Sequence, residues 1–596
     1  MKNRIQNIFR LLLILTILAQ GSIANAREWK EEIIYFILID RFYDGDRMND
    51  FDVNTKDPRG FHGGDIEGII QKLDYLQNLG VTALWVSPVF KNRPMRFFEH
   101  QPYHGYWVWD FFSTDSRFGD MEKLRRLSNE LHRRNMKLIL DMVVNHADYN
   151  APIVDQYPSW FHPFGNITDW NDARQVRDFR VFGLPDFASE KKVVGLFFQS
   201  VAKYWYDEIQ PDGFRLDAVK HVPLSFWENF NRSIINRNGN RFLLLGEMLD
   251  GNPDVIADTF TKGRFTSLFD YPLYYSLHDV IAKDGDFREM GVRLFQDRKY
   301  EDANQLATFL DNHDLERFMT SCGNNHRRYR LALAFLLTAR GIPTLTYGNE
   351  VGLDGAQEPT PLNRRDMVFE KNPDILEFTR KLIDLRKSSE ALSRGIQVQL
   401  SMDRDTYAFT RFVESEQAIV LFNKGKTAHS FAAPLWAPLP EGTQLKNVAG
   451  TSNAAVERGK LVTTLEPESF AVFIAGVAKN TYRELLMETI AWKKNPRLLG
   501  MRKFDFSLRG SAIPPSADVF MIGDIPELGE WKADGNPPKM TKVGDGCYEV
   551  SLSLPFYSIC QFKFMYKDHG KVVWQDCANT ILEVESALPE RYEFNW

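Results

Sequence analysis

The segment that decides the fold is Gly213-Phe214-Arg215-Leu216-Asp217-Ala218-Val219-Lys220-His221, in which a hydrophobic run ends in charged side chains. Three other segments share this pattern: Leu138 to His146, Leu243 to Glu247 and Phe309 to Asp314. One such segment says little. Four in series are typical of successive strands of a parallel barrel, with polar groups at the carboxyl-terminal rim, where barrel enzymes hold their chemistry.

The sequence around these segments alternates short β-rich runs with amphipathic stretches. Ile33 to Ile39 and Val81 to Val86 are typical of strands, and the apolar residues of Gly64 to Leu79 recur at helical spacing. The alternation predicts a parallel sheet, and its length suits a (β/α)8 barrel over residues 27–388. The rhythm breaks at about 147–188, which predicts an inserted B domain after the third strand.

The C-terminal third of the chain has a different pattern. Short alternating strands predict a small all-β domain at 389–476, and the charged, helical stretch at 477–498 is interpreted as a linker. Residues 499–596 return to short strands separated by Gly, Pro and Asp turns, which predicts a separate β-sandwich. The fold class is therefore α/β, with two β domains after the barrel.

The amino-acid composition indicates which kinds of ligand the protein is suited to bind. A chain of 596 residues is too long for one core, so several domains are expected. The net charge of −6 argues against nucleic acid, which proteins bind through basic groups. The 13% aromatic content suits a partner with flat apolar faces, such as a sugar, although a large aromatic core explains it as well.

The N-terminus has the features of a signal peptide over residues 1–26. Lys2, Arg4 and Arg10 precede a short apolar run, and Ala24-Asn25-Ala26 fits a cleavage site. We therefore expect an exported protein, extracellular or periplasmic, with an uncleaved anchor as the alternative. No later stretch is apolar enough to span a membrane, so no span is expected after cleavage.

The cysteines do not predict a metal site. Cys322, Cys547, Cys560 and Cys577 have no metal-like spacing. Three of them lie near the C-terminus, so one disulfide there is an open alternative for an exported protein.

Asp217 and Glu247 suit the cleavage of a glycosidic bond. Such cleavage needs an acid for the leaving oxygen and an opposing carboxylate, and the two lie about 5 Å apart in retaining enzymes. Arg215 shares a strand face with Asp217, so its charge would keep Asp217 ionised as a nucleophile. Glu247 follows an apolar run, which would raise its pKa and keep it protonated. Asp314, with His313, could bind sugar hydroxyls or stabilise positive charge at the transition state.

Each residue taken singly has a plainer explanation. An Asp after a strand is often a helix N-cap, and a rim histidine is more often a loop residue than a catalyst. The prediction therefore depends on the set of four segments.

The four segments resemble the conserved regions of the α-amylase family, glycoside hydrolase family 13. Leu184-Pro185-Asp186 resembles the family motif of the inserted domain, Tyr103 to Trp107 its substrate-stacking segment and Gly341 to Pro343 its last strand. The similarity covers residues 30 to about 475. It implies Asp217 as nucleophile, Glu247 as acid/base and Asp314 as transition-state stabiliser.

The resemblance also implies residues that bind the substrate α-glucan. They are Tyr106, His146, Arg215 and His313 around the attacked sugar, Lys220 and His221 on the leaving side, Arg364 on the remote glycone side, and Phe182, which falls where glucanotransferases keep a central aromatic residue. Arg364 belongs to Thr360-Pro361-Leu362-Asn363-Arg364, which has Thr where the family motif usually has Asp.

Calcium (Ca2+) is the cofactor that the resemblance implies. Asn145, Asp186 and the His221 carbonyl match a site that ties the inserted domain to the barrel, and such oxygen ligands suit a hard cation. A second candidate loop contains Asp44, Asp46, Asn49 and Asp50, with Asp65. An Asx-rich turn without an ion is the alternative there.

Residues 499–596 resemble the starch-binding module of carbohydrate-binding family 20. The resemblance implies that Trp531 and Trp574 form an exposed platform for glucose rings, with Lys563 and Asn579 binding hydroxyls. The alternative is that both indoles belong to the core of the sandwich. A tethered module of this kind raises the local concentration of substrate.

Several positions bear on the choice among family members. Lys220-His221 and the segment Glu247 to Gly251 resemble endo-acting α-amylases, and Leu249 stands where glucanotransferases usually carry an aromatic residue. Phe182 and the Asp44 loop resemble glucanotransferases. We therefore expect a monomeric, secreted, retaining α-1,4-glucan endohydrolase. The alternatives are a cyclodextrin glucanotransferase-like transglycosylase, a neopullulanase-type hydrolase and, last, a non-catalytic starch-binding protein.

Overall fold

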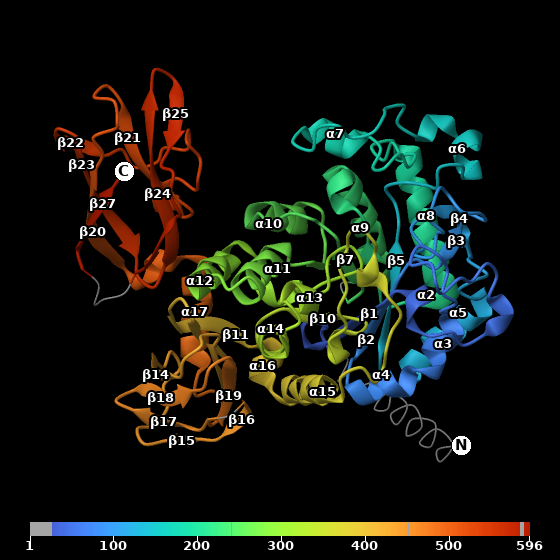
Figure 1. The fold of residues 1–596 in the computed structure, drawn as a ribbon, viewed down its shortest axis with the longest axis horizontal. Coiled ribbons are helices and arrows are strands. Elements are labelled where there is room, and N and C mark those ends of the chain that lie inside the picture. The colour runs from blue at the N-terminus through green and yellow to red at the C-terminus, as the bar shows by residue number, and fades with distance from the viewer. Residues whose placement is uncertain (1–26, 240, 451, 585–588) are drawn as a thin grey trace, which may run out of the picture.

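The computed structural model describes residues 27–239, 241–450, 452–584 and 589–596, as a barrel followed by two β domains (Figure 1). The expected signal peptide, residues 1–26, lies outside the described residues. Within the described ranges, no helix combines the length and hydrophobicity needed to cross a bilayer.

Eight parallel strands form the barrel, and their order around the sheet is β8-β7-β6-β5-β2-β1-β10-β9. A single bridge between Phe269 and Ala307 joins the two ends of this order, β8 and β9. The prediction of a (β/α)8 barrel is confirmed. The strands are β1 (Ile34–Ile37), β2 (Ala83–Val86), β5 (Lys137–Met142), β6 (Gly213–Leu216), β7 (Leu243–Gly246), β8 (Ser267–Leu268), β9 (Ala307–Phe309) and β10 (Ile342–Thr346).

The strands are almost entirely buried because helices cover the outside of the barrel, as expected for a parallel sheet. Asp120 caps the helix α5 (Met121–Arg133) by accepting a hydrogen bond from the Lys123 amide. The other long helices of the barrel are α8 (Lys192–Ile209), α9 (Leu224–Asn238), α10 (Pro253–Lys262), α11 (Tyr271–Leu277), α12 (Phe287–Phe295), α14 (His326–Thr338) and α15 (Pro373–Ser388).

Two expected elements have different bounds in the structure. The run from Ile33 to Ile39 gives a strand of four residues, because the chain turns into the short helix α2 (Ile39–Phe42). The helix expected between Gly64 and Leu79 is two helices, α3 (Ile66–Gln71) and α4 (Leu73–Leu79). Lys72 separates them because its backbone is not helical at φ −101° and ψ 8°.

The inserted B domain lies beyond the carboxyl end of β5. It contains the short helices α6 (Pro152–Gln156) and α7 (Ala173–Asp178) and is otherwise irregular. Two isolated bridges, His146 to Asp186 and Phe161 to Phe187, connect its first and last segments. A hairpin of β3 (Phe90–Asn92) and β4 (Val108–Thr114) lies beside it.

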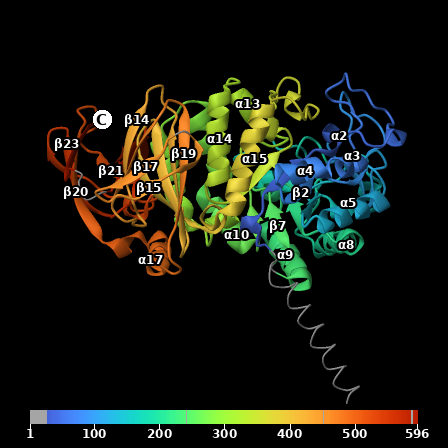
Figure 2. The ribbon, with the colours of Figure 1, turned by 90° about the horizontal axis from the view of Figure 1, so that it is seen from below.

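The C domain, which follows the barrel, consists of two antiparallel sheets. The first has the order β11-β12-β13-β19-β16, and the second has the order β14-β18-β17-β15. Helices α14 and α15 lie between these sheets and the barrel strands (Figure 2). The strands are β11 (Ile396–Met402), β12 (Thr406–Phe412), β13 (Glu416–Asn423), β14 (His429–Pro434), β15 (Gln444–Leu445), β16 (Asn447–Gly450), β17 (Ala454–Glu457), β18 (Lys460–Leu465) and β19 (Ser469–Gly476).

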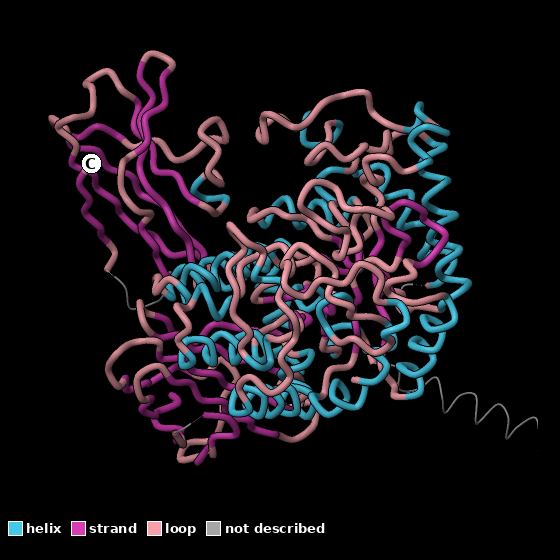
Figure 3. The backbone as a smooth tube through the Cα atoms, turned by 45° about the vertical axis from the view of Figure 1, so that its right-hand side comes forward, coloured by secondary structure: helices cyan, strands magenta, loops and turns pink. Residues whose placement is uncertain are grey.

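A helix, α17 (Arg483–Lys494), leads from the C domain into the C-terminal β-sandwich. The sandwich has its own hydrophobic core, built around Phe504, Phe506, Phe562 and Phe564. Its strands form a block apart from those of the C domain (Figure 3). They are β20 (Met501–Arg509), β21 (Asp518–Gly523), β22 (Thr541–Gly544), β23 (Cys547–Pro555), β24 (Ile559–Asp568), β25 (Lys571–Trp574), β26 (Thr580–Glu583) and β27 (Arg591–Asn595).

Candidate active site

The sequence-predicted carboxylates meet at the carboxyl rim of the barrel. Asp217 directly follows β6, and its amide donates to the Met142 carbonyl at 3.1 Å. Glu247 directly follows β7, and its amide donates to the Leu216 carbonyl at 2.9 Å. Each residue is therefore held by the neighbouring strand, so the rim geometry follows from the register of the barrel.

One guanidinium, that of Arg215, lies at the centre of the site. Its Nη1 donates to Asp217 Oδ1 at 2.6 Å, and its Nη2 lies 2.8 Å from Glu247 Oε2. A third carboxylate, Asp141, accepts from Nη1 at 3.0 Å. Arg215 itself is completely buried. A buried cation among three carboxylates leaves an excess of negative charge, which favours retention of a proton within the group.

The contact between Asp217 and Glu247 indicates which residue holds that proton. Burial raises the pKa of both groups, and Arg215 opposes this for both. The charge of Asp314 raises the pKa of both groups, but the interaction between the two carboxyl groups lowers the pKa of Asp217 and raises that of Glu247. The arrangement therefore favours an ionised Asp217 beside a protonated Glu247.

Asp314 faces the same site from the loop after β9. Its Oδ1 accepts from Arg364 Nη2 at 2.8 Å, and its Oδ2 lies 3.0 Å from His313 Nε2. Burial opposes ionisation of Asp314, but the contact with His313 and the charges of Arg364 and Arg215 outweigh it, so its pKa lies below the usual range. Asp314 therefore carries a full negative charge in the cleft.

Aromatic and imidazole rings form one wall of the site. The ring of Tyr106 stacks on that of His313 at 5.1 Å, with 5° between the ring planes. His146 Nε2 lies 3.1 Å from the Tyr106 carbonyl oxygen. Nδ1 of His146 and Nδ1 of His313 have no hydrogen-bond partner among the described residues. Both nitrogens are buried in the wall rather than exposed to the cleft.

Sequence reasoning did not assign a role to three residues that support the site. Asp141 accepts from the Tyr106 hydroxyl at 2.8 Å and from Trp85 Nε1 at 3.0 Å. It therefore positions both the aromatic wall and Arg215. The Tyr271 hydroxyl donates to Glu247 Oε1 at 3.3 Å. Asp141 lies within the segment from Leu138 to His146 and could have been singled out, whereas Tyr271 follows a strand of two residues that has no clear sequence pattern.

The leaving side of the cleft is polar and open. Lys220 Nζ donates to the Leu249 carbonyl and to Asp250 Oδ2, both at 3.3 Å. The Leu249 side chain is 44% exposed. His221 Nδ1 lies 2.7 Å from the carbonyl of Val176, which belongs to the B domain. This side of the cleft is therefore formed jointly by the barrel and the B domain.

The glycone side is a cavity of about 570 Å3 lined by aromatic side chains. Phe182 is 81% exposed on its rim, and the Tyr149 hydroxyl donates to the Phe182 carbonyl. Arg364 lines the same cavity and donates through Nε to the His313 carbonyl at 2.6 Å. The structure thus brings together all the barrel residues that were expected to bind substrate.

The first calcium candidate has unpaired buried groups but lacks a complete ligand set. Asp186 Oδ1 and Asn145 Nδ2 are buried without a partner among the described residues, and amide orientation is assigned from such contacts. The other oxygen of Asp186 lies 2.7 Å from His162 Nδ1, and burial raises the Asp186 pKa to about 7. These groups fit a hard cation that would replace the proton.

The second candidate loop divides into two groups. Asp65 accepts from the amides of Gly45, Asp46 and Gly68 and from Asn49 Nδ2, and Asp46 pairs with Lys123. Both carboxylates thus already have partners. In contrast, Asp44 Oδ1, Asn49 Oδ1 and Asp50 Oδ1 are buried without partners in the described chain. Three such oxygens fit a calcium ion, although no cluster of three His, Cys, Asp or Glu side chains with metal-binding geometry occurs in the described ranges.

The C-terminal sandwich presents the four expected sugar-binding residues near its β24 strand. Trp574 is 40% exposed at the end of β25. Trp531 lies in a turn, and its backbone amide donates to the Gly523 carbonyl. Lys563 Nζ donates to the carbonyls of Gln575 and Cys577, and Asn579 Nδ2 donates to Gln561. Trp574 is thus not a core residue.

The cysteines of this sandwich are unpaired. Cys560 is buried and Cys577 is exposed, and each of the four cysteines of the chain is a free thiol in the structure. The disulfide that was left open in the sequence analysis is therefore absent.

Comparisons with known proteins identify the class to which this barrel and its site belong. The family model for the α-amylase catalytic domain matches residues 36–157 and 150–377, and the model for the starch-binding domain matches residues 504–592. The chain therefore belongs to the α-amylase family, glycoside hydrolase family 13, and carries a starch-binding domain. It is an enzyme of this family that acts on α-glucans.

Individual relatives carry different activities. A beta/alpha-amylase of Paenibacillus polymyxa is 34% identical over 76% of this chain, which spans 39% of that protein. A cyclomaltodextrin glucanotransferase of Klebsiella oxytoca is 28% identical over 93% of this chain and 92% of its own length. The crystal structure of an Anoxybacillus α-amylase superposes with a TM-score of 0.71 at 34% identity, covering 76% of this chain and 99% of that one.

Proposed function

We propose that the protein is an exported, retaining α-1,4-glucan endohydrolase, an α-amylase. One observation carries the reaction type: Asp217 and Glu247 both contact the Arg215 guanidinium, at 2.6 and 2.8 Å. Carboxylates bridged in this way suit the short separation of a retaining pair, about 5–5.5 Å, and leave no room for an attacking water between them. The charge distribution supports Asp217 as the nucleophile and Glu247 as the acid.

The first half of the reaction follows from these assignments. Asp217 Oδ attacks the anomeric carbon while Glu247 gives its proton to the glycosidic oxygen, and the leaving glucan departs with a free hydroxyl group. Positive charge develops on the ring of the attacked sugar. Asp314, ionised and 42% exposed to the cleft, faces that charge.

The second half reverses the proton movement. Glu247, now a carboxylate, takes a proton from water, and the resulting nucleophile breaks the bond between the sugar and Asp217. Tyr106 and His313 hold the ring from one side through their stacked wall. The anomeric configuration is retained because two inversions occur at the same carbon.

The leaving side favours hydrolysis over transfer. A glucanotransferase must hold an acceptor sugar there while it excludes water. Leu249 offers no flat ring for an acceptor sugar, and the neighbouring Lys220 is held by the Leu249 carbonyl and Asp250. Water therefore reaches the covalent intermediate more easily than a weakly held acceptor.

A glucanotransferase is the second candidate, and two observations favour it. Phe182 projects from the rim of the glycone side, where a curved glucan could wrap around it. The Klebsiella glucanotransferase also resembles this chain over nearly its whole length. A neopullulanase-type hydrolase is a third candidate within the same family.

A time course of products distinguishes these candidates. Amylose, pullulan and cyclodextrin are incubated with the enzyme, and the products are separated by chromatography. We expect short linear maltooligosaccharides of α configuration from amylose, with cyclic or elongated glucans as minor species. Predominantly cyclic products would establish the transferase, and rapid cleavage of pullulan would establish the neopullulanase type.

The assignment of the acid is tested separately with Glu247→Gln. We expect kcat on starch to fall by about 10²–10⁴-fold, the range of general acid–base catalysis. Glu414→Gln, on the surface of the C domain, is the matched control and should be unaffected. If Glu247→Gln hydrolysed starch at the normal rate, Glu247 would not be the acid.

The proposal includes calcium as a structural ion. Asn145, Asp186 and the His221 carbonyl would hold one ion, and Asp44, Asn49 and Asp50 a second. Bound there, the ions would supply positive charge to buried oxygens that otherwise lack partners. The first would fix the B domain against the barrel rim, where His221 helps to form the leaving side.

A further inference from the structure

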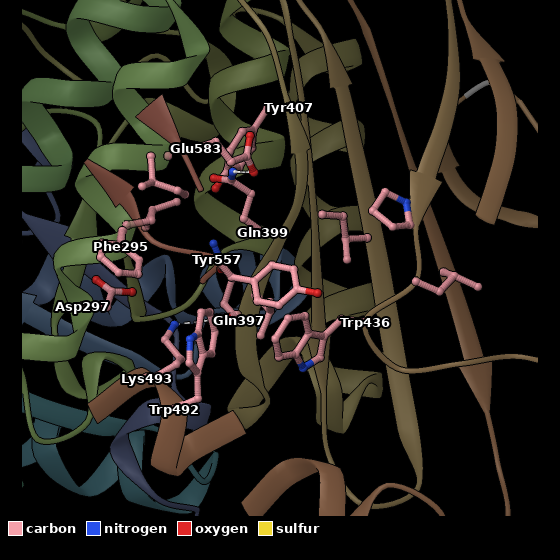
Figure 4. A pocket seen from close by; sticks show the side chains of 17 residues that line it. Phe295, Asp297, Gln397, Gln399, Tyr407, Trp436, Trp492, Lys493, Tyr557 and Glu583 are labelled. Carbon is pink, nitrogen blue, oxygen red and sulfur yellow. Dashed lines mark hydrogen bonds between the residues drawn. The ribbon is translucent and has the colours of Figure 1, made fainter. Parts of the chain in front are cut away.

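A second cavity, open on one side, lies away from the catalytic cleft, where four parts of the chain meet. It has a volume of about 190 Å3. Helix α12 of the barrel, strands β11 and β14 of the C domain, helix α17 and the turn before β24 of the starch-binding domain all contribute to its lining (Figure 4). Nothing in the catalytic reaction uses this cavity.

Three aromatic side chains form one wall of the cavity. The rings of Trp436 and Trp492 lie 5.0 Å apart with 32° between their planes, and Tyr557 meets Trp436 edge-on at 5.5 Å. Tyr557 is 48% exposed and adopts a left-handed backbone conformation at φ 59°. Such a conformation is rare for an aromatic residue and requires support from its surroundings. The wall therefore combines the buried ring of Trp492, the partly buried ring of Trp436 and an exposed ring at the entrance.

Two buried donors on the lining have no acceptor. Trp492 Nε1 and Gln397 Nε2 lack a hydrogen-bond partner among the described residues, although both side chains are at least nine-tenths buried. The amide orientation of Gln397 is fixed because its oxygen already accepts from the Arg340 amide at 2.8 Å. Buried donors without partners are rare in native proteins and point to a missing acceptor.

The charged groups around the cavity already have partners. Both oxygens of Asp297 bond to Arg340, at 2.9 and 2.6 Å, and Lys493 Nζ donates to the Gln397 carbonyl at 2.7 Å. Glu583 accepts from Gln399 Nε2. The donors that remain are neutral, so the cavity suits an uncharged ligand rich in hydroxyl groups rather than an anion or a cation.

The size of the cavity limits the ligand to about one ring. A cavity of about 150 Å3 is enough to bind benzene, so 190 Å3 accommodates one six-membered ring with its substituents. A glucan chain could enter only by its end. Tyr557, at the exposed side, lies where the next sugar would emerge.

We propose that this cavity binds the terminal glucose unit of a linear α-glucan. One ring face packs against Trp436 and Trp492. When these side chains shift to admit the sugar, ring hydroxyls accept from Trp492 Nε1 and Gln397 Nε2, which are buried in its absence. The second sugar stacks on Tyr557. The inference rests on α-glucans as the substrate class and is independent of whether the enzyme hydrolyses or transfers them.

Binding there would connect the starch-binding domain to the catalytic domain. Tyr557, Ile559 and Glu583 belong to the former, whereas Gly291, Leu294 and Phe295 belong to barrel helix α12. A sugar held between them contacts both and favours the orientation seen here. A bound chain end would therefore stiffen the enzyme while it lies on a starch granule.

The test uses 19F NMR of the full chain labelled with 5-fluorotryptophan. Trp492→Phe, Trp436→Phe and Trp574→Phe assign the three resonances of interest. Maltotriose, which has chain ends, should shift the resonances of Trp492 and Trp436. β-Cyclodextrin has no end, so it should shift the resonance of Trp574 and leave those two in place.

Tyr557→Ala is the main variant, because a half-exposed side chain can be removed without opening a core. It should weaken the response of Trp492 to maltotriose about tenfold and leave the response of Trp574 to β-cyclodextrin unchanged. Trp492→Phe keeps an aromatic ring but removes the Nε1 donor. It should weaken the binding of maltotriose, measured from the Trp436 resonance.

Two outcomes would overturn the proposal. One is that maltotriose leaves the Trp492 and Trp436 resonances in place at concentrations that saturate the response of Trp574. The other is that the two saccharides shift them equally and Tyr557→Ala changes nothing, since the shift would then come from a distant site. Neither outcome would alter the product pattern from amylose, so a failure here is distinguishable from a failure of the proposed function.

Discussion

The catalytic cleft and the starch-binding domain approach the same polymer by opposite physical means. In the cleft, Asp141, Asp217 and Glu247 crowd around one buried guanidinium, and Asp314 adds a further negative charge. In the starch-binding domain, the expected contact is the exposed ring of Trp574, and its neighbours Lys563 and Asn579 are bonded to the protein itself. The cleft is buried and charged, whereas the platform is exposed and neutral.

The two regions should differ in their sensitivity to pH and to single substitutions. Buried like charges cost free energy unless they are neutralised, so the cleft depends on Arg215 and on protons. Its chemistry is therefore sensitive to pH and to single substitutions. A ring on the surface depends only on the area that it covers, so the platform should tolerate pH changes and lose affinity in small steps.

The largest effect is expected for Asp217→Asn. Loss of the nucleophile should lower kcat on amylose by at least about 10⁴-fold, the scale seen when a central catalytic group is removed. Binding to starch granules should stay normal because the starch-binding domain is untouched. Asp545→Asn, an exposed change in that domain, is the matched control for both assays. Parallel loss of turnover and granule binding would remove the separation between the two regions.

Calcium removal should affect the barrel and spare the starch-binding domain. An ion present at 100 times its dissociation constant contributes about 2.7 kcal/mol to stability. Calorimetry with EDTA should therefore lower the melting temperature of the barrel transition, and Ca²⁺ should restore it. Mg²⁺ at the same concentration should not, because it demands a tighter octahedral geometry. Identical melting curves with Ca²⁺ and EDTA would contradict the assignment of both sites.

Trp574→Ala tests the other side of the comparison. Loss of the exposed ring should weaken granule binding about tenfold, since an aromatic stacking contact contributes on the order of 1 kcal/mol. Turnover of short maltooligosaccharides in solution should be unchanged. Val543→Ala, which shortens another exposed side chain of the domain, should leave both measurements as they are. Equal losses on granules and on soluble substrates would argue against a platform.

The smallest effect is a shift in pH dependence. Glu247 must be protonated to act as the acid, so activity is lost as pH rises through its pKa. The charge of Asp314 raises that pKa. Asp314→Asn should therefore move the basic limb of kcat/KM for maltoheptaose to lower pH, by up to about one unit. Asp366→Asn, on the surface, should leave the limb in place, and a shift to higher pH in Asp314→Asn would reverse the inferred roles.

Much of the barrel could be predicted from sequence because its strands are buried on both faces and appear as hydrophobic runs. The segments that begin at Leu138, Gly213 and Leu243 gave strands at the expected positions, which end at Met142, Leu216 and Gly246. Strand β8, with two residues, was not predicted, since so short a run has no period. The break at Lys72 was also missed, because the apolar spacing continues across it while the backbone does not.

The sequence predicted which residues form the candidate site, but it did not predict which of them contact one another. Arg215 was expected to serve Asp217, and it does, but it also bonds Glu247 and Asp141. Sequence spacing cannot show that three strands deliver carboxylates to one guanidinium. The cavity around Trp492 gave no signal at all, because its walls come from segments separated by up to about 290 residues.

The barrel is closed by a weak strand pair, β8 and β9, which lies between the catalytic residues. One bridge, from Phe269 to Ala307, joins β8 to β9, whereas the other neighbouring strands share longer ladders. Asp217 and Glu247 lie on one side of this seam, and Asp314 lies on the other. A small separation of β8 from β9 would move Asp314 away from Asp217 and Glu247, while the other strand pairs kept their hydrogen bonds. Loss of activity on heating can therefore precede unfolding. Substitutions that add contacts between β8 and β9 should delay this thermal inactivation.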